Sequence, residues 1–245
     1  MGAGLSIPFA IETPVIDNDG YGLMSDAGLL CVLSRNPLFA GLSRCVLEAL
    51  LPALQPVVRH YKKNNVILSE GDAMALVGYL LEGRMFAQKL SSGGRAHILS
   101  MYEEGQSFGF DAVFSSFGTS PLTFVAETDC TTLFLSLDFL FAQPTETGLQ
   151  ILRNIGRVLA DDSVRLLYKT DILSKSSLRE RILSYFAILE QKSHGGPFSL
   201  RMTREQFAQY LCVNRSALSR ELNRMQKEGL IETRANGKMR VKHVL

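Results

Sequence analysis

Glycines at a nearly regular interval divide residues 57–138 into short β-forming runs. Gly71, Gly83, Gly94 and Gly105 follow one another at steps of 12, 11 and 11 positions, and the runs between them are rich in aliphatic and aromatic side chains. Tight turns often require a positive φ, which glycine adopts at little cost. Turn signals at this spacing are typical of an antiparallel sandwich or barrel. The sequence therefore predicts an N-terminal antiparallel β-roll of the jelly-roll or cupin-like type.

A long proline-free stretch with helical spacing follows at residues 147–173. Leucines recur in it every seven positions, and a seven-residue repeat turns one stripe of a helix towards a partner helix. Asp162 and Lys169 interrupt the neighbouring row, so a helix that packs only on its own domain is the alternative. The predicted dimer interface is the apolar stripe Leu152, Ile155, Leu159, Leu166 and Leu173.

Positive charge is concentrated at the C-terminal end. The whole chain has a net charge of +2, but residues 175–245 contain 14 Lys/Arg against 6 Asp/Glu, whereas residues 1–174 contain 12 against 18. A basic segment on an acidic body favours a polyanionic partner for that segment. A solvated basic surface without a partner would have the same composition, so charge alone does not decide between the two.

Sequence signals divide this basic segment into three helices and a hairpin. Capping boxes start helices after Ser177 and Thr203. Asn214 is placed to cap a third helix, for which Gly229 is a stop signal. Asn236-Gly237 is typical of a hairpin turn between two short strands. Helix, three-residue turn, helix and hairpin is the order of a winged helix-turn-helix.

The third helix would present polar side chains outward from its first turn. Residues at the start of a recognition helix reach base edges in the major groove, and the arginine fork pairs with guanine. Basic residues further along the helix and on the hairpin suit phosphates. Surface ion pairs with Glu205 or Glu221, or a protein-binding role of the motif, are the alternatives. The predicted DNA-binding residues are Arg215, Ser216, Ser219, Arg220, Arg224, Lys227, Arg234, Lys238 and Arg240.

The order of these parts resembles the CRP/FNR family of bacterial transcription regulators. The resemblance covers roughly residues 35–245, and its most specific stretches are Glu70–Asp72, Leu81–Gly83, His97–Gly109 and Thr203–Ile231. It implies a cyclic-nucleotide-binding-type roll, a homodimer on double-stranded DNA with palindromic half-sites, and RNA polymerase as a partner if the protein is an activator. An effector in the roll would shift the DNA-binding domains.

The predicted organisation is α+β with four parts. An N-terminal arm at 1–30 precedes an effector-sensing β-roll at 31–146, a dimerisation helix at 147–174 and a winged helix-turn-helix at 175–245. The apolar stretches are far shorter than the roughly 20 residues needed to cross a bilayer, and the N-terminus lacks the basic start of a signal peptide. We therefore predict a cytoplasmic protein without membrane contact.

Two departures from the family pattern argue against cyclic AMP. In cAMP-responsive members a glutamate follows the glycine of the FGE segment and binds the ribose, whereas here Phe110 follows Gly109. Those members also bring an arginine and a serine to the phosphate, and the matching place here is Ser120-Pro121. An anion buried without a partner costs several kcal/mol, so cAMP is not the expected effector.

No other cofactor is expected, and neither is catalysis. The iron–sulfur members need an N-terminal cysteine cluster, and the four cysteines here form no C-x-x-C pair. His97 is a candidate haem ligand, but a lone histidine in a strand is more often structural. A cupin metalloenzyme would need several histidines and a carboxylate, and the roll offers only His60 and His97. We therefore predict neither haem, iron–sulfur cluster nor metal, and no enzyme.

A small apolar or aromatic molecule is the effector that the predicted roll would suit. Ligand sites are mostly apolar with a few polar groups. The alternatives are an effector-independent regulator, in which the same residues are filled core, and a binding module that acts on a protein partner. The predicted effector-binding residues are Tyr79, Leu99, Phe108, Phe110, Ser120, Leu166 and Leu167.

Overall fold

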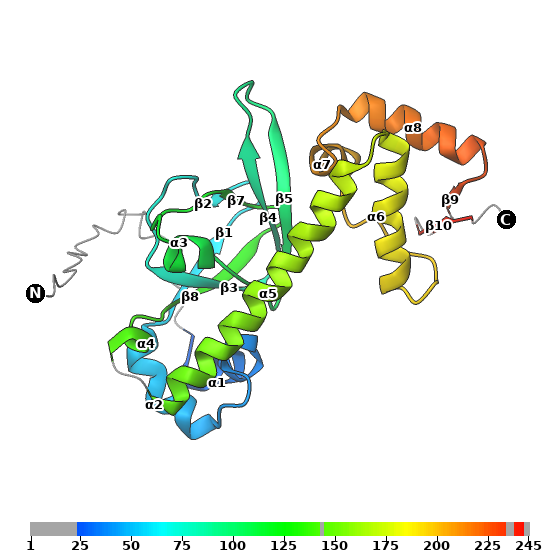
Figure 1. The fold of residues 1–245 in the computed structure, drawn as a ribbon. Helices are drawn as coiled ribbons and strands as arrows, with labels where there is room; N and C mark the ends of the chain where they lie inside the picture. Colours follow the sequence, from blue (N-terminus) through cyan, green and yellow to red (C-terminus); the bar gives the residue numbers. More distant parts are fainter. Residues whose placement is uncertain (1–23, 143–144, 234–237, 243–245) are drawn as a thin grey trace, which may run out of the picture. The chain divides into compact units, whose positions relative to one another are not determined.

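The computed structural model describes residues 24–142, 145–233 and 238–242 (Figure 1). They form two compact units, the first made of the described residues up to 87 with 101–158, and the second of 88–100 with the described residues from 159 on. Most of the predicted arm lies outside the described residues, as do Arg234 and the turn at Asn236-Gly237.

Two four-stranded sheets build the predicted roll. Their strand orders are β1-β8-β3-β6 and β2-β7-β4-β5, and the pairings of β8 with β1 and β3, of β3 with β6 and of β2 with β7 are all antiparallel. The antiparallel β-roll is therefore confirmed. The strands are β1 (Val57–Tyr61), β2 (Val66–Leu68), β3 (Leu76–Glu82), β4 (Arg84–Leu90), β5 (Ala96–Glu103), β6 (Ser107–Phe108), β7 (Thr123–Ala126) and β8 (Cys130–Ser136).

The regularly spaced glycines make turns, as predicted. All four have a positive φ. At Gly83, between β3 and β4, φ is +91° and an added Cβ would lie 2.3 Å from the carbonyl oxygen of Asp129. Both the backbone conformation and the close approach therefore require glycine at this turn.

Aromatic rings fill the space between the sheets. Phe108 lies 5.3 Å from Phe124 and 5.8 Å from Phe134, measured between ring centroids, and Tyr102 packs against the same group. The ring of Phe108 presses on the backbone of Gly78, where a Cβ would lie 2.2 Å from its Cζ atom. This part of the roll is therefore close-packed core.

Helices extend the first unit beyond the roll. They are α1 (Asp26–Arg35), the 3-10 helix η1 (Pro37–Phe39), α2 (Arg44–Leu54), α3 (Phe110–Phe114), α4 (Phe139–Ala142) and the first part of α5 (Glu146–Ser174). Helix α1 begins inside the stretch 1–30 that the sequence predicts as an N-terminal arm. Asn154 of α5 donates to the carbonyl oxygens of Leu38 and Ala40, both at 3.0 Å. Its neighbours Ile151 and Ile155 are buried.

The second unit contains three helices and a small hairpin near the C-terminus. They are α6 (Leu178–Lys192), α7 (Arg204–Tyr210), α8 (Arg215–Lys227), β9 (Ile231–Thr233) and β10 (Met239–Val241), and the two strands pair antiparallel. Both predicted capping boxes, at Ser177 and at Thr203, are formed. Asn214 does precede α8, but its side chain makes no capping bond, so that detail of the prediction is wrong.

Candidate nucleic-acid interface and ligand cavity

Helices α7 and α8 are held together by apolar side chains. Phe207, Ala208 and Leu211 are buried on one side, and Leu218 and Leu222 on the other. A backbone hydrogen bond of 2.9 Å from the amide of residue 213 to the carbonyl oxygen of Ala208 closes the turn between them. The two helices therefore form a fixed unit that determines which side chains of α8 face outward.

The turn between the two helices contains an unusual backbone conformation. Cys212 has a φ of +56°, in the left-handed region that non-glycine residues seldom adopt. The turn lets α8 start in a new direction immediately afterwards. The predicted three-residue turn at 212–214 is therefore present, with a cysteine in the place where glycine would be unstrained.

The outward face of α8 is basic. Of the predicted reading residues, Arg215, Ser216 and Arg220 are exposed and Ser219 is half-buried. Further along, Arg224 pairs with Glu228, with 3.0 Å between Nε and Oε1. Among the residues that the structure describes, Arg215, Arg220 and Lys227 have no carboxylate partner, so their positive charges are available to a ligand.

Arg179 of α6 forms ion pairs with Glu221 of α8 and with Glu228, the residue that follows this helix. Its Nε lies 2.6 Å from Oε1 of Glu221, and its Nη1 lies 2.6 Å from Oε2 of Glu228. These hydrogen bonds from Arg179 hold the pKa of the Glu228 carboxyl below its usual value. The alternative that Glu221 pairs with Arg215 or Arg220 is therefore not realised. Arg179 was missed by sequence reasoning because its partners lie 42 and 49 positions away.

The hairpin adds two exposed basic side chains to the same unit. Lys238 and Arg240 are exposed, while Met239 between them is buried together with Ile231. Lys242 lies 3.6 Å from Glu232 across the hairpin. In this alternation the buried Met239 and Ile231 pack the hairpin onto the second unit, and Lys238 and Arg240 on either side of Met239 face solvent.

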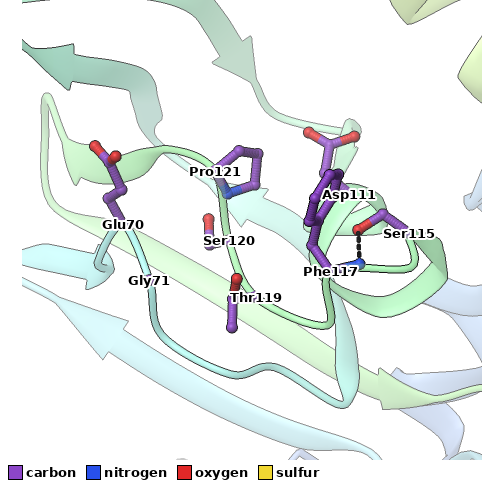
Figure 2. Close-up of a pocket in the computed structure, with 8 residues that line it drawn as sticks. All are labelled: Glu70, Gly71, Asp111, Ser115, Phe117, Thr119, Ser120 and Pro121. Carbon is purple, nitrogen blue, oxygen red and sulfur yellow. Dashed lines mark hydrogen bonds between the residues drawn. The ribbon is translucent and has the colours of Figure 1, made fainter.

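A cavity of about 520 Å³ opens in the first unit, between the turn before β3, α3 and the loop that leads to β7 (Figure 2). The loop is pinned to the turn, because the amide of Gly71 donates to Ser120 and the amide of Ser120 donates to Asp72, at 2.8 and 2.9 Å. The amide of Phe117 donates to the Ser115 hydroxyl at 3.3 Å (Figure 2). The lining residues are Glu70, Gly71, Asp111, Ser115, Phe117, Thr119, Ser120 and Pro121.

Of the predicted effector-binding residues, Ser120 lines this cavity. Tyr79, Phe108 and Phe110 are buried, and Phe108 belongs to the aromatic core. Leu99, Leu166 and Leu167 belong to the second unit, where Leu166 and Leu167 are 47% and 68% exposed. Asp111 and Phe117 line the cavity but were missed, since nothing in their spacing indicates that α3 and the following loop face the Glu70 turn.

The predicted dimer stripe on α5 is largely accessible. Leu152 is 38% exposed and Leu166 is 47% exposed, and Leu159 and Leu173 are half-buried. Ile155 differs, because it is 4% exposed and packs within its own unit. Other apolar side chains on this helix that are about half exposed or more are Leu149, Val164, Leu167 and Tyr168.

Within the described ranges, no three His, Cys, Asp or Glu side chains come together in a way that could hold a metal ion. Cys31, Cys45 and Cys212 are exposed free thiols, and Cys130 is buried. Among the same residues, no helix has the length and apolar character needed to cross a membrane.

Two family models match the chain. Residues 58–143 match the cyclic nucleotide-binding domain, and residues 180–244 match the Crp-like helix-turn-helix domain. The chain belongs to the CRP/FNR family of transcription regulators. This CRP/FNR regulator is accordingly a DNA-binding protein and not an enzyme, and the resemblance seen in its sequence is confirmed.

Curated relatives and solved structures agree with this assignment. The regulator is 27% identical over 179 residues to the regulatory protein HlyX of Actinobacillus pleuropneumoniae, which is 69% of this chain and 72% of HlyX. It is 28% identical over 179 residues to an anaerobic regulatory protein of Haemophilus influenzae, and the match covers 69% of this chain and 67% of that protein. The c-di-GMP-responsive global regulator CLP of Xanthomonas campestris shares the fold, with a TM-score of 0.67 at 20% identity over 82% of this chain and 100% of that chain.

Proposed function

We propose that this CRP/FNR regulator acts as a homodimer in the cytoplasm, reads palindromic DNA half-sites with α8, and is controlled by a small molecule other than cAMP in the cavity of its first unit. The observation that carries the DNA-reading part is the outward face of α8, where three basic side chains have no carboxylate partner among the described residues. An activator of this design would also contact RNA polymerase.

Sequence reading rests on the first two turns of α8. Arg220 is suited to a G·C pair, because its guanidinium can bind O6 and N7 of guanine together. In the family resemblance a glutamate one step after the position of Arg215 reads a cytosine, and Ser216 replaces it here. The pair formerly read by glutamate is therefore specified more loosely.

The remaining basic residues hold the phosphate backbone. Lys227 has no carboxylate partner among the described residues, and Arg224 shares its charge with Glu228. Such contacts position a protein on DNA without reading its sequence. The hairpin completes this set with Arg234, Lys238 and Arg240.

Dimerisation through α5 explains the exposed leucines of that helix. Leu152 and Leu166 are 38% and 47% exposed among the described residues, and a seven-residue repeat suits pairing with the same helix of a second copy. A dimer of this kind places two α8 helices about one turn of DNA apart.

An effector other than cAMP is favoured by the chemistry of the cavity. Ser120 and Pro121 line it at the positions where the resemblance would require the phosphate-binding groups, and no Lys, Arg or His in the described part of the chain lines it. A buried anion would therefore lack a partner. The same argument speaks against any effector that relies on a phosphate. Haem and iron–sulfur clusters are not part of the proposal.

Selection of bound DNA from a random pool tests the proposed function. The full chain should enrich a palindrome with one G·C pair fixed in each half, and cell extract or a metabolite mixture should change the yield of that palindrome. Enrichment of an asymmetric site would contradict the homodimer. Failure to enrich any sequence, with retention of DNA only at low salt, would contradict sequence-specific reading.

A further inference from the structure

Among the described residues, the side chains around the cavity carry negative charge and no positive charge. Glu70 and Asp111 both line it, together with three hydroxyl residues, and no Lys, Arg or His of the described ranges does. Asp111 is exposed and forms no ion pair with any residue in the described part of the chain. In Figure 2, Ser120 and Pro121 lie between Glu70 and Asp111. A ligand in this space is therefore met by carboxylates instead of by cations.

An exposed aromatic ring lies in the same lining. Phe117 is 84% exposed, the largest exposure among the big apolar side chains of the described residues. Its loop is held at both ends, by the bond of its own amide to Ser115 and by the pairing of Thr119 with Ala73. A phenyl ring held in open solvent beside a cavity can cover the apolar part of a ligand, and its face attracts a cation.

We infer that the cavity binds an organic cation, an amine or ammonium group attached to an apolar body, and that it rejects anionic nucleotides. The ammonium would lie at Asp111, with Glu70 adding to the negative potential, and the apolar body would lie against Phe117 and Pro121. A volume of about 520 Å³ is within the usual range of small-molecule sites. This inference rests on the proposed function, since it names the class of effector for the same cavity.

The absence of tryptophan from the chain allows a direct test. In the full-length Phe117→Trp variant, the introduced indole is the only tryptophan and reports on the cavity alone. Three probes of similar size differ in charge: 2-phenylethylammonium, 2-phenylethanol and phenylacetate, with cAMP as a fourth. The cation should give a saturable fluorescence change with a dissociation constant about tenfold below that of the alcohol, because a hydrogen bond between charged groups is stronger than one from a neutral hydroxyl. Phenylacetate and cAMP should give no saturable fluorescence change.

Two further substitutions in the same background assign the effect to its residue. Asp111→Asn keeps the shape of the side chain and should abolish the preference for the cation over the alcohol. Asp138→Asn removes the same charge from the same unit outside the cavity lining and should leave the preference intact.

The outcomes separate the inference from the proposed function. If phenylacetate or cAMP binds as tightly as the cation, or if the preference survives Asp111→Asn, the ligand class is wrong while the cavity remains an effector site. If no probe gives a saturable change at millimolar concentration, the cavity is not a small-molecule site, and both the inference and the effector part of the proposed function are overturned.

Discussion

Lys169 of α5 is a buried cation that has no carboxylate partner among the described residues. We expect it to make the stability of the second unit depend on pH, and the Lys169→Met substitution should remove this dependence. Its side chain is 3% exposed, and its ammonium donates to the carbonyl oxygens of Ile98 and Leu99 on the edge strand β5. The same nitrogen lies 4.0 Å from the ring centroid of Tyr210. These contacts stabilise the ammonium only in part, and its removal from water on burial disfavours the charged form.

The size of the effect follows from the pKa. Burial lowers the pKa of Lys169 from 10.5 to about 8, and a difference of about 2.5 in pKa corresponds to roughly 3 kcal/mol. Below pH 8 both the folded and the unfolded chain carry the proton, so folding bears the whole cost of burying the charge. Between pH 8 and 10.5 the unfolded chain binds more protons than the folded one, and the free energy of unfolding rises with pH.

Tyr210 limits the useful pH range. Burial raises its pKa to about 12, so above pH 10 the folded chain holds this proton more tightly than the unfolded chain does. Stability contributed by Tyr210 then falls as pH rises, opposite to the effect of Lys169. The window from pH 8 to 10 therefore avoids Tyr210. Burial also raises the pKa of the Cys130 thiol above its usual value of 9.0, which opposes the lysine within this window, so the contribution of Lys169 is the difference in slope between the unmodified protein and the Lys169→Met variant.

Urea unfolding followed by circular dichroism at several pH values across this window is the assay. The unmodified protein should become more stable with rising pH, and Lys169→Met should be at least as stable at neutral pH and lack this rise. Lys192→Met, at the exposed end of α6, is the matched control and should keep the slope. A slope unchanged by Lys169→Met would refute the reasoning.

Three further expectations concern the first unit and the assembly. Gly78→Ala should destabilise the protein by about 1–3 kcal/mol in urea unfolding, because the new methyl would lie 2.2 Å from the Phe108 ring. An unchanged urea midpoint would contradict the close packing of this core. Leu159→Lys combined with Leu166→Lys should give monomers in sedimentation and loss of operator binding, and a double variant that stays dimeric would place the interface elsewhere. Cyclic AMP should leave the melting temperature unchanged, whereas a ligand at 100 times its dissociation constant would stabilise the fold by about 2.7 kcal/mol.

Features that depend on neighbouring residues were predictable from the sequence. The glycine turns, exemplified by Gly83, and the capping boxes at Ser177 and Thr203 each rest on a local conformation or on groups three positions apart. The apolar spacing of α7 and α8 likewise fixed the orientation of Arg220 to solvent. Local patterns of this kind carry the fold class and the exposed face of α8.

Features that depend on distant contacts were not predictable. Arg179 is neutralised by carboxylates more than forty positions away, and no local pattern marks it. The cavity is formed because the loop with Phe117 returns to the turn at Gly71, so the residues chosen from the aromatic runs, such as Phe108, proved to be core. Helix α1 was missed because its start lies in a stretch rich in glycine and aspartate.

The central claim is that α8 reads DNA sequence through Arg220, and two matched substitutions test it most directly. Arg220→Ala and Lys227→Ala each remove one positive charge from the exposed side of α8. Fluorescence anisotropy, with the selected operator and with random DNA over a range of salt concentrations, measures the DNA affinity of both variants. Arg220→Ala should weaken binding by roughly 1–3 kcal/mol per half-site on the operator alone and relax the base preference at one position. Lys227→Ala should weaken binding to both DNAs alike and lower the slope of the salt dependence by about one. An equal loss on operator and random DNA for Arg220→Ala would contradict the account.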